Sequence, residues 1–108
     1  MTRRMKRRYL FLHVVGDQSV SEGALMDNLW KALFQLFGEY GASQARLALI
    51  EYNAQERWAI VRCLNKALQM VRASITSITE INDRPATVHV SGVSGTLKGL
   101  RKKAQVQD

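Results

Sequence analysis

The chain is short of cysteine and of long apolar runs. Cys63 is its single cysteine, so an internal disulfide is impossible and we expect a reducing compartment, the cytoplasm. It has no run of about 18 apolar residues, which excludes a transmembrane helix, and we expect no membrane partner. The N-terminus is basic but lacks the apolar block of a signal peptide.

The remaining composition is that of one small folded domain. The chain has 108 residues, of which 46% are hydrophobic, so disorder is not expected. We predict a basic arm at residues 1–7, one α/β domain at residues 8–104 and a tail at residues 105–108.

The positive charge lies at the two ends of the chain. The net charge is +7, with +5 in residues 1–8, +4 in residues 98–103, −1 in residues 9–97 and −1 from Asp108. A nearly neutral body with two basic arms favours binding to a polyanion over simple solubilisation. The terminal residues predicted to bind RNA phosphates are Arg3, Arg4, Lys6, Arg7, Arg8, Lys98, Arg101, Lys102 and Lys103.

Hydrophobic periodicity predicts four strands and two helices. The strands are expected at residues 8–15, 45–52, 57–63 and 86–92, and residues 80–85 are expected to form a turn. Ser19 and Glu22 have the spacing of a capping box, so a helix should begin near Val20 and end at Gly38 to Gly41. Its apolar positions are Leu25, Leu29, Leu33, Leu36 and Tyr40. Asn65 is expected to cap the second helix, which reaches Ile78.

The order β-α-β-β-α-β favours a ferredoxin-like α/β sandwich, similar to RNA-recognition folds, with an antiparallel sheet and both helices on one face. After the fourth strand, Ser94 or Thr96 could cap an extra short helix. Leu97, Leu100 and Ala104 would form its apolar edge.

The glycines before this helix resemble a phosphate loop but have the wrong spacing. The segment GVSGTLKG matches neither GxxxxGK[ST] nor GxGxxG, which argues against a mononucleotide site. We interpret Gly92 and Gly95 as a structural turn from strand into helix. Lys98, one turn into the helix, could hold one RNA phosphate.

The outer face of the sheet allows two interpretations. Strand alternation places Tyr9, Phe11 and His13 on this face, and Trp58, Ile60 and Arg62 join them if Ala59, Val61 and Cys63 face the helices. Aromatic side chains there could stack RNA bases. Alternatively, the extra helix or a partner subunit covers the face.

Within the body, Arg62, Lys66 and Arg72 form the main basic group. Either they extend the phosphate-binding surface of the termini, or they form a helix face that is simply exposed to solvent. We expect no catalytic residues and no metal site, because His13, His89 and Cys63 lack ligand spacing. Glu51 should pair with Arg57 or Arg62 across strands.

Two segments carry a family resemblance. IVRCLNKALQMVRASI (60–75) and VSGVSGTLKGLRKK (90–103) resemble the archaeal ribonuclease P protein component 2 family, the counterpart of the Pop-five subunit of eukaryotic ribonuclease P and MRP. RRYLFLHVV and LALIEYN resemble its first two strands. The similarity covers residues 7–103, and the VRC, VRAS and VSGVSGT pieces are its most specific parts.

The resemblance implies a non-catalytic, RNA-binding subunit that supports ribonuclease P RNA during removal of 5′ leaders from precursor tRNA. It implies that the RNA performs the chemistry with bound magnesium, and that the protein itself carries no cofactor. It also implies a TIM-barrel partner, ribonuclease P protein component 3, and allows a homodimer within a heterotetramer. Precursor tRNA would be an indirect partner.

Two other classes stay open. A small acylphosphatase needs an arginine in the loop after the first strand, and the loop here, GDQSVSEG, is acidic and has none. A generic ferredoxin-like interaction or regulatory module would not need the charged termini, and its binding to RNA would hardly depend on salt.

Overall fold

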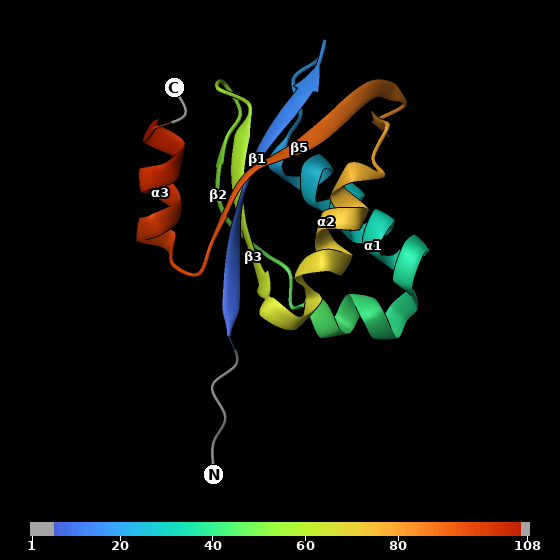
Figure 1. Ribbon diagram of the computed structural model, residues 1–108. Helices are drawn as coiled ribbons and strands as arrows, with labels where there is room; N and C mark the ends of the chain where they lie inside the picture. Colours follow the sequence, from blue (N-terminus) through green and yellow to red (C-terminus); the bar gives the residue numbers. More distant parts are fainter. Residues whose placement is uncertain (1–5, 107–108) are drawn as a thin grey trace.

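The computed structural model describes the backbone of residues 6–106 and the side chains of residues 6–102 (Figure 1). The elements follow in the order β1 (Arg7–Gly16), α1 (Glu22–Ala45), β2 (Ala48–Asn53), β3 (Trp58–Leu64), the 3-10 turn η1 (Asn65–Ala67), α2 (Leu68–Thr76), β4 (Glu80–Ile81), β5 (Arg84–Ser94) and α3 (Leu97–Val106). Within this part of the chain, no helix is long and apolar enough to cross a membrane.

The sheet has five strands in the order β2-β3-β1-β5-β4, and all pairings are antiparallel. β1 is central, because Leu10 pairs with Val61 of β3 and with Val93 of β5. Helices α1 and α2 cover one face of the sheet (Figure 1). This is the ferredoxin-like β-α-β-β-α-β sandwich with a short edge strand and a C-terminal helix added, so the fold prediction is confirmed.

The main core lies between the sheet and helices α1 and α2. Leu10, Leu12 and Val14 are buried there, as the alternation of β1 predicts. The pairing of β1 with β5 shifts between Phe11 and Leu12. Because this shift leaves one extra residue in β5, both Val90 and Val93 pack against the core.

Helix α1 differs from its sequence prediction at both ends. Its N-cap is Ser21, whose Oγ accepts a hydrogen bond from the Ala24 amide at 3.1 Å, instead of the predicted Ser19 box. The helix continues to Ala45 across a kink at Gly38, which has φ 73° and ψ −179°. Glycine tolerates that left-handed conformation, so the chain bends there without ending the helix. The second strand therefore starts at residue 48 and not at residue 45.

Two smaller predictions are also wrong. Asn65 does not cap the second helix, because it lies inside η1 and the side chain makes no capping bond. Residues 80–85 are not one turn: Glu80 pairs with Pro85 and Ile81 with Arg84, and only Asn82 and Asp83 turn. Both of these residues have positive φ, as a tight hairpin requires.

Helix α3 lies on the face of the sheet opposite α1 and α2 (Figure 1). Leu100 is fully buried and Ile60 is 1% exposed, although Ile60 points away from the main core. Leu100 lies next to Gly92, since a Cβ there would be in ordinary contact with Leu100 Cδ1 at 3.7 Å. Gly92 is thus a residue of β5 and not of the predicted turn, which Gly95 and Thr96 form.

Candidate nucleic-acid interface

Antiparallel pairing gathers basic residues at one end of the sheet. The start of β1, the start of β2, the end of β3 and the end of β5 all lie at this end. We call it the basic end and define it by Lys6, Arg7, Arg8, Arg46, Arg62, Lys66 and Lys98. These residues come from four separate parts of the sequence, so the fold converts scattered charges into one surface.

Specific contacts hold this end together. The Asn65 amide donates to the Lys6 carbonyl at 2.8 Å, which fixes the start of the chain beside η1. Lys66 Nζ donates to Gln44 Oε1 at 3.1 Å and so lies beside the end of α1. Arg46 is the C-cap of α1 and has φ 48°. The partner of Lys66 is a neutral amide, so this hydrogen bond does not pair its positive charge with a carboxylate.

The opposite end of the sheet is acidic. Asp17 follows β1, Glu56 lies in the turn between β2 and β3, and Glu80 and Asp83 belong to the β4–β5 hairpin. Arg57 and Arg84 are in this region as well. The Arg57 guanidinium donates to the Gly16 carbonyl, and the Arg84 guanidinium lies 3.7 Å from the Asp17 carboxylate. The molecule is therefore electrically polar along its strands, and a phosphate chain is attracted to one end and repelled from the other.

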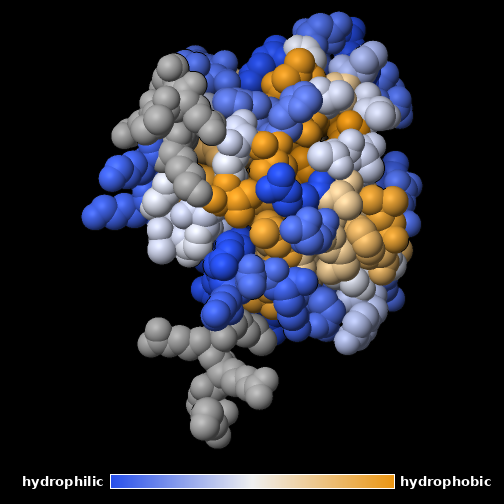
Figure 2. Space-filling model, viewed as in Figure 1, coloured by the Kyte–Doolittle hydropathy of each residue, from blue (hydrophilic) through white to orange (hydrophobic). Residues whose placement is uncertain are grey.

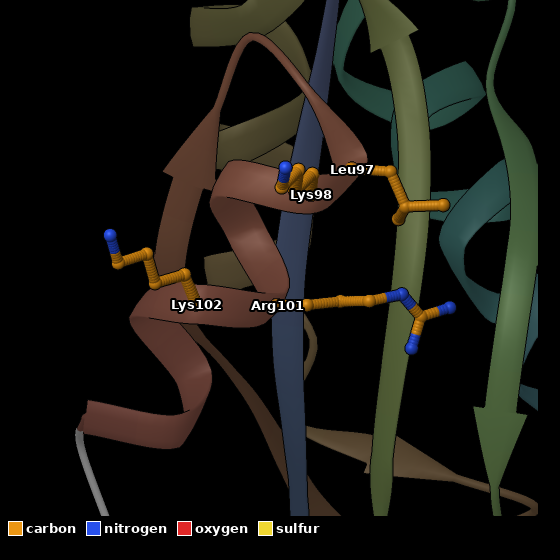
Figure 3. A pocket seen from close by; sticks show the side chains of 4 residues that line it. All are labelled: Leu97, Lys98, Arg101 and Lys102. Carbon is orange, nitrogen blue, oxygen red and sulfur yellow. The ribbon is translucent and has the colours of Figure 1, made fainter.

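Helix α3 extends the basic surface through Lys98 and Lys102, which are both exposed. Figure 3 shows their side chains together on one side of the helix, while Leu97 and Arg101 point toward the neighbouring strands. These four residues line an open hollow of about 680 Å³. Arg101 Nη2 donates to Glu51 Oε1, so the prediction that Glu51 pairs with Arg57 or Arg62 is wrong. Helix α3 lies over the sheet and places the Arg101 guanidinium beside the Glu51 carboxylate.

The turn before α3 is built by hydroxyl groups. Thr96 Oγ1 accepts from the Gly99 amide at 3.0 Å and caps the helix, and Ser94 Oγ accepts from the Thr96 amide at 3.3 Å. Gly95 does not have a positive φ. A Cβ on Gly95 would lie 3.1 Å from Arg8 Nη1, so the missing side chain lets the Arg8 guanidinium lie over the turn.

The aromatic residues of the outer face contact one another. The rings of Phe11 and Trp58 stack with centroids 5.3 Å apart and an angle of 24° between their planes. The ring of His13 meets Phe11 edge-on at 5.2 Å. Tyr9, Phe11 and Trp58 are half-buried, and α3 packs on the same face. The arrangement agrees with cover by the extra helix, and base stacking by these rings stays a prediction.

The other predicted RNA-binding residues are scattered. Arg72 is exposed on α2, in the helix layer. Arg3, Arg4 and the side chain of Lys103 lie outside the described residues, as does most of the predicted 1–7 arm. Sequence reasoning missed Arg46, because its position seemed to be strand interior. The left-handed C-cap instead places it at the surface.

Among the described residues, two titratable side chains, Cys63 and Tyr52, have clearly raised pKa values. Burial raises the pKa of the Cys63 thiol to about 11, so it stays protonated at neutral pH. Burial also raises the pKa of Tyr52, and the nearby Arg57 lowers it in part. The Tyr52 hydroxyl donates to the Val20 carbonyl and ties β2 to the start of α1. In residues 6–106, no group of three His, Cys, Asp or Glu side chains could hold a metal ion.

A second surface is apolar and lies on α1. We call it the α1 apolar face and define it by the exposed residues Trp30, Phe34 and Phe37, whose spacings of four and three place them on one side of the helix. Leu36 and Tyr40 are also exposed on α1 but lie outside this stripe. Phe34 is 53% and Tyr40 78% exposed. Leu36 and Tyr40 were predicted to be core residues, but Leu25, Leu29 and Leu33 already fill the side facing the sheet. Figure 2 shows a hydrophobic area on the right, over α1 and α2.

Comparisons with known proteins agree on one family. The sequence pattern of the Rpp14/Pop5 family matches residues 8–105. Ribonuclease P protein component 2 of Pyrococcus furiosus is 31% identical over 102 residues, which cover 94% of this chain and 85% of that protein. The protein of the same name from Methanosarcina barkeri is 31% identical over 100 residues, covering 93% and 73%.

A solved structure supports the same assignment at the level of the fold. A chain in the cryo-EM structure of yeast ribonuclease MRP matches with a TM-score of 0.73 and 12% sequence identity, covering 99% of this chain and 97% of that one. At this identity the match concerns the fold alone, whereas the sequence pattern spans nearly the whole chain. The chain therefore belongs to the Rpp14/Pop5 family.

Proposed function

We propose that this chain is the RNA-binding, non-catalytic protein subunit of a ribonuclease P that removes 5′ leaders from precursor tRNA. The observation that carries the proposal is the basic end, where seven cationic side chains from four parts of the sequence meet. The names of its archaeal relatives support the same role. We also propose that the chain works in the cytoplasm, because its single, free cysteine fits a reducing compartment.

The mechanism is electrostatic. Lysine and arginine side chains that contact phosphates release the cations condensed on the RNA, and this release drives binding. Once those phosphates are neutralised, RNA segments repel one another less and pack at a lower concentration of magnesium. We place the magnesium ions on the RNA, and this chain supplies positive charge without acid or base catalysis.

The α1 apolar face takes part in a different contact. An exposed patch of aromatic and aliphatic side chains is typical of protein interfaces. The side chains of the α1 apolar face carry no charge, so they do not attract a phosphate backbone. We propose that it binds the TIM-barrel subunit, ribonuclease P protein component 3. We also propose that the complex can contain a homodimer of this chain within a heterotetramer.

Reconstitution tests the proposed function directly. Ribonuclease P RNA and the TIM-barrel subunit are assayed for cleavage of precursor tRNA over a series of magnesium concentrations, with and without this chain. We expect the chain to lower the magnesium concentration at half-maximal rate. An unchanged magnesium dependence would contradict the proposal. Hydrolysis of an acyl phosphate by the chain alone would favour the enzyme alternative instead.

A further inference from the structure

Tyr40 is the most exposed of the large apolar and aromatic side chains in the part of the chain that the structure describes, at 78%. It does not belong to the α1 apolar face, because the kink at Gly38 lies between Tyr40 and Phe37, the last residue of that face. Single exposed rings are common on protein surfaces. The surroundings of Tyr40 therefore decide what the ring can bind.

The kink turns the end of α1 toward the basic end. After Gly38, the last segment of the helix runs beside η1 (Figure 1). Gly41, Ala42 and Ala45 form the buried side of this segment. A Cβ on Gly41 would lie 3.3 Å from Met70 Sδ, so the segment packs closely on α2. Tyr40 thus stands on the outer side of a well-packed support.

The packing places the ring of Tyr40 close to two cations of the basic end. Tyr40 and Gln44 are four residues apart within the segment, so their Cβ atoms lie about 5–6 Å from each other on one side of the helix. Gln44 Oε1 accepts a hydrogen bond from Lys66 Nζ at 3.1 Å, and Arg46 follows as the C-cap. Glu39, the acidic residue of this segment, lies about 140° around the helix from Gln44.

An exposed ring beside lysine and arginine matches the two parts of a nucleotide. Proteins that bind single-stranded RNA stack its bases on aromatic rings and hold its phosphates with cations. Because the bases of an RNA helix are stacked on one another, a protein ring stacks on an unpaired base. The rings of the outer sheet face are less available, since Phe11 and Trp58 stack on each other and are half-buried.

We propose that Tyr40 stacks on the base of an unpaired RNA nucleotide, and that Lys66 and Arg46 contact the phosphates beside this nucleotide. The inference rests on the proposed function and adds a preference to it: the basic end binds RNA with an unpaired nucleotide more tightly than a continuous helix. The two contributions differ in their dependence on salt. Phosphate contacts release cations, whereas stacking on a neutral ring releases none.

The test compares an RNA hairpin that has a bulge of unpaired uridines with the same hairpin without the bulge. Fluorescence anisotropy gives the dissociation constants of both for the full chain over a series of salt concentrations. Tyr40→Ala removes the ring, and Tyr40→Phe keeps the ring but removes the hydroxyl. Leu36→Ala is the matched control, because Leu36 is an exposed apolar residue of α1 that lies before the kink.

We expect Tyr40→Ala to weaken binding of the bulged hairpin by about 5- to 150-fold, the usual effect of removing a ring that stacks on a base. The salt slope should stay unchanged, and the paired hairpin should be bound as before. Tyr40→Phe and Leu36→Ala should behave like the wild type. Circular dichroism confirms that each variant is folded.

The phosphate contacts are tested with a pair of double variants. Arg46→Glu with Lys66→Glu should weaken binding of both hairpins and make the salt slope shallower by up to about 1.8. Lys31→Glu with Arg84→Glu changes the net charge equally but lies away from the basic end, and should leave the slope as it is. Equal slopes for the two double variants would overturn the assignment of Lys66 and Arg46.

Three further results would overturn the stacking role of Tyr40. They are equal loss of affinity for the two hairpins with Tyr40→Ala, equal loss with Tyr40→Phe and Tyr40→Ala, and no loss with Tyr40→Ala. If Tyr40→Ala instead abolished the complex with the TIM-barrel subunit in light scattering and kept its affinity for RNA, the ring would belong to a protein interface. In each of these cases, steep salt dependence of the wild-type chain would leave the proposed function standing. Salt-independent binding by the wild-type chain would overturn both.

Discussion

At the residue scale, the position of a charge in the fold decides whether it is available to RNA. Arg46 is available because a left-handed C-cap places it at the surface beside the end of α1. Arg101 belongs to a basic run in the sequence, but its guanidinium is engaged by Glu51. The number of cations in a segment therefore overestimates the number of phosphate contacts that the segment can make.

Replacement of Glu51 by Gln should release Arg101. Because the guanidinium can then contact a phosphate, we expect tighter RNA binding and a salt slope steeper by up to about 0.9. The measurement is the dissociation constant for structured RNA across a series of salt concentrations. Glu56→Gln is the matched control, since it removes the same charge from the acidic end. Equal effects of the two variants would show that Arg101 gains nothing from the loss of its partner.

The buried thiol of Cys63 gives a prediction about pH. Its pKa of about 11 in the folded chain is above the ordinary value of 9.0, so the folded state holds the proton more tightly than the unfolded state. Stability from this group is complete below pH 9 and is lost as the pH rises toward 11. At pH 8 we expect iodoacetamide to modify the folded chain about 100-fold more slowly than the chain in denaturant. Similar rates in the two states would contradict burial of the thiol.

At the scale of elements, Leu100 is the fully buried side chain among the described side chains of α3, those of residues 97–102. It is buried on the outer face of the sheet, where Ile60 is also buried. The Arg101–Glu51 pair adds little to stability, because it is about half exposed. Within this described part of the helix, Leu100 is therefore the main apolar anchor of the segment that carries Lys98 and Lys102.

Leu100→Ala should reduce the free energy of unfolding by about 2–5 kcal/mol, the usual cost of removing a buried leucine side chain. Urea unfolding followed by tryptophan fluorescence measures this loss, since Trp58 is on the same face of the sheet. Leu97→Ala is the control, because Leu97 lines the open hollow and is only half-buried. A loss no greater than that of Leu97→Ala would contradict the anchoring role of Leu100.

The sequence predicted the long, regular elements well and their junctions poorly. Alternation over Leu10, Leu12 and Val14 identified β1 and its two faces. The end of α1 was misplaced because Gly38 was taken as a stop signal, whereas the helix bends there and resumes. For the site, the charged termini were visible in the sequence. Their position at the same end of the sheet as Arg46 and Lys66 could not be predicted, because it depends on antiparallel pairing between distant strands.

At the scale of the whole molecule, two chemically different surfaces adjoin along helix α1. The basic end is formed by the ends of the strands and reaches the end of α1 through Arg46 and Lys66, whereas the α1 apolar face lies earlier on that helix (Figure 1). The two surfaces share no residue, which suits a subunit that binds RNA and a protein at the same time. Disruption of one surface should leave binding at the other intact.

Phe34→Glu tests this independence. Phe34 is 53% exposed, so the variant should fold, but a charge in the centre of the α1 apolar face should abolish binding of the TIM-barrel subunit. Light scattering measures the complex, and the affinity for RNA should be unchanged. Gln69→Glu, on α2 and exposed, is a control for added charge. Retention of the complex by Phe34→Glu would place the protein interface elsewhere.

The central claim is that the basic end binds RNA phosphates, and the salt dependence of RNA affinity tests it most directly. For the full chain, we predict that the logarithm of the binding constant falls with the logarithm of salt concentration with a slope of about −3 or steeper. Arg46→Glu with Lys66→Glu should make the slope shallower, and Lys31→Glu with Arg84→Glu should not. A wild-type slope shallower than about −1, or equal slopes for the two double variants, would contradict the claim.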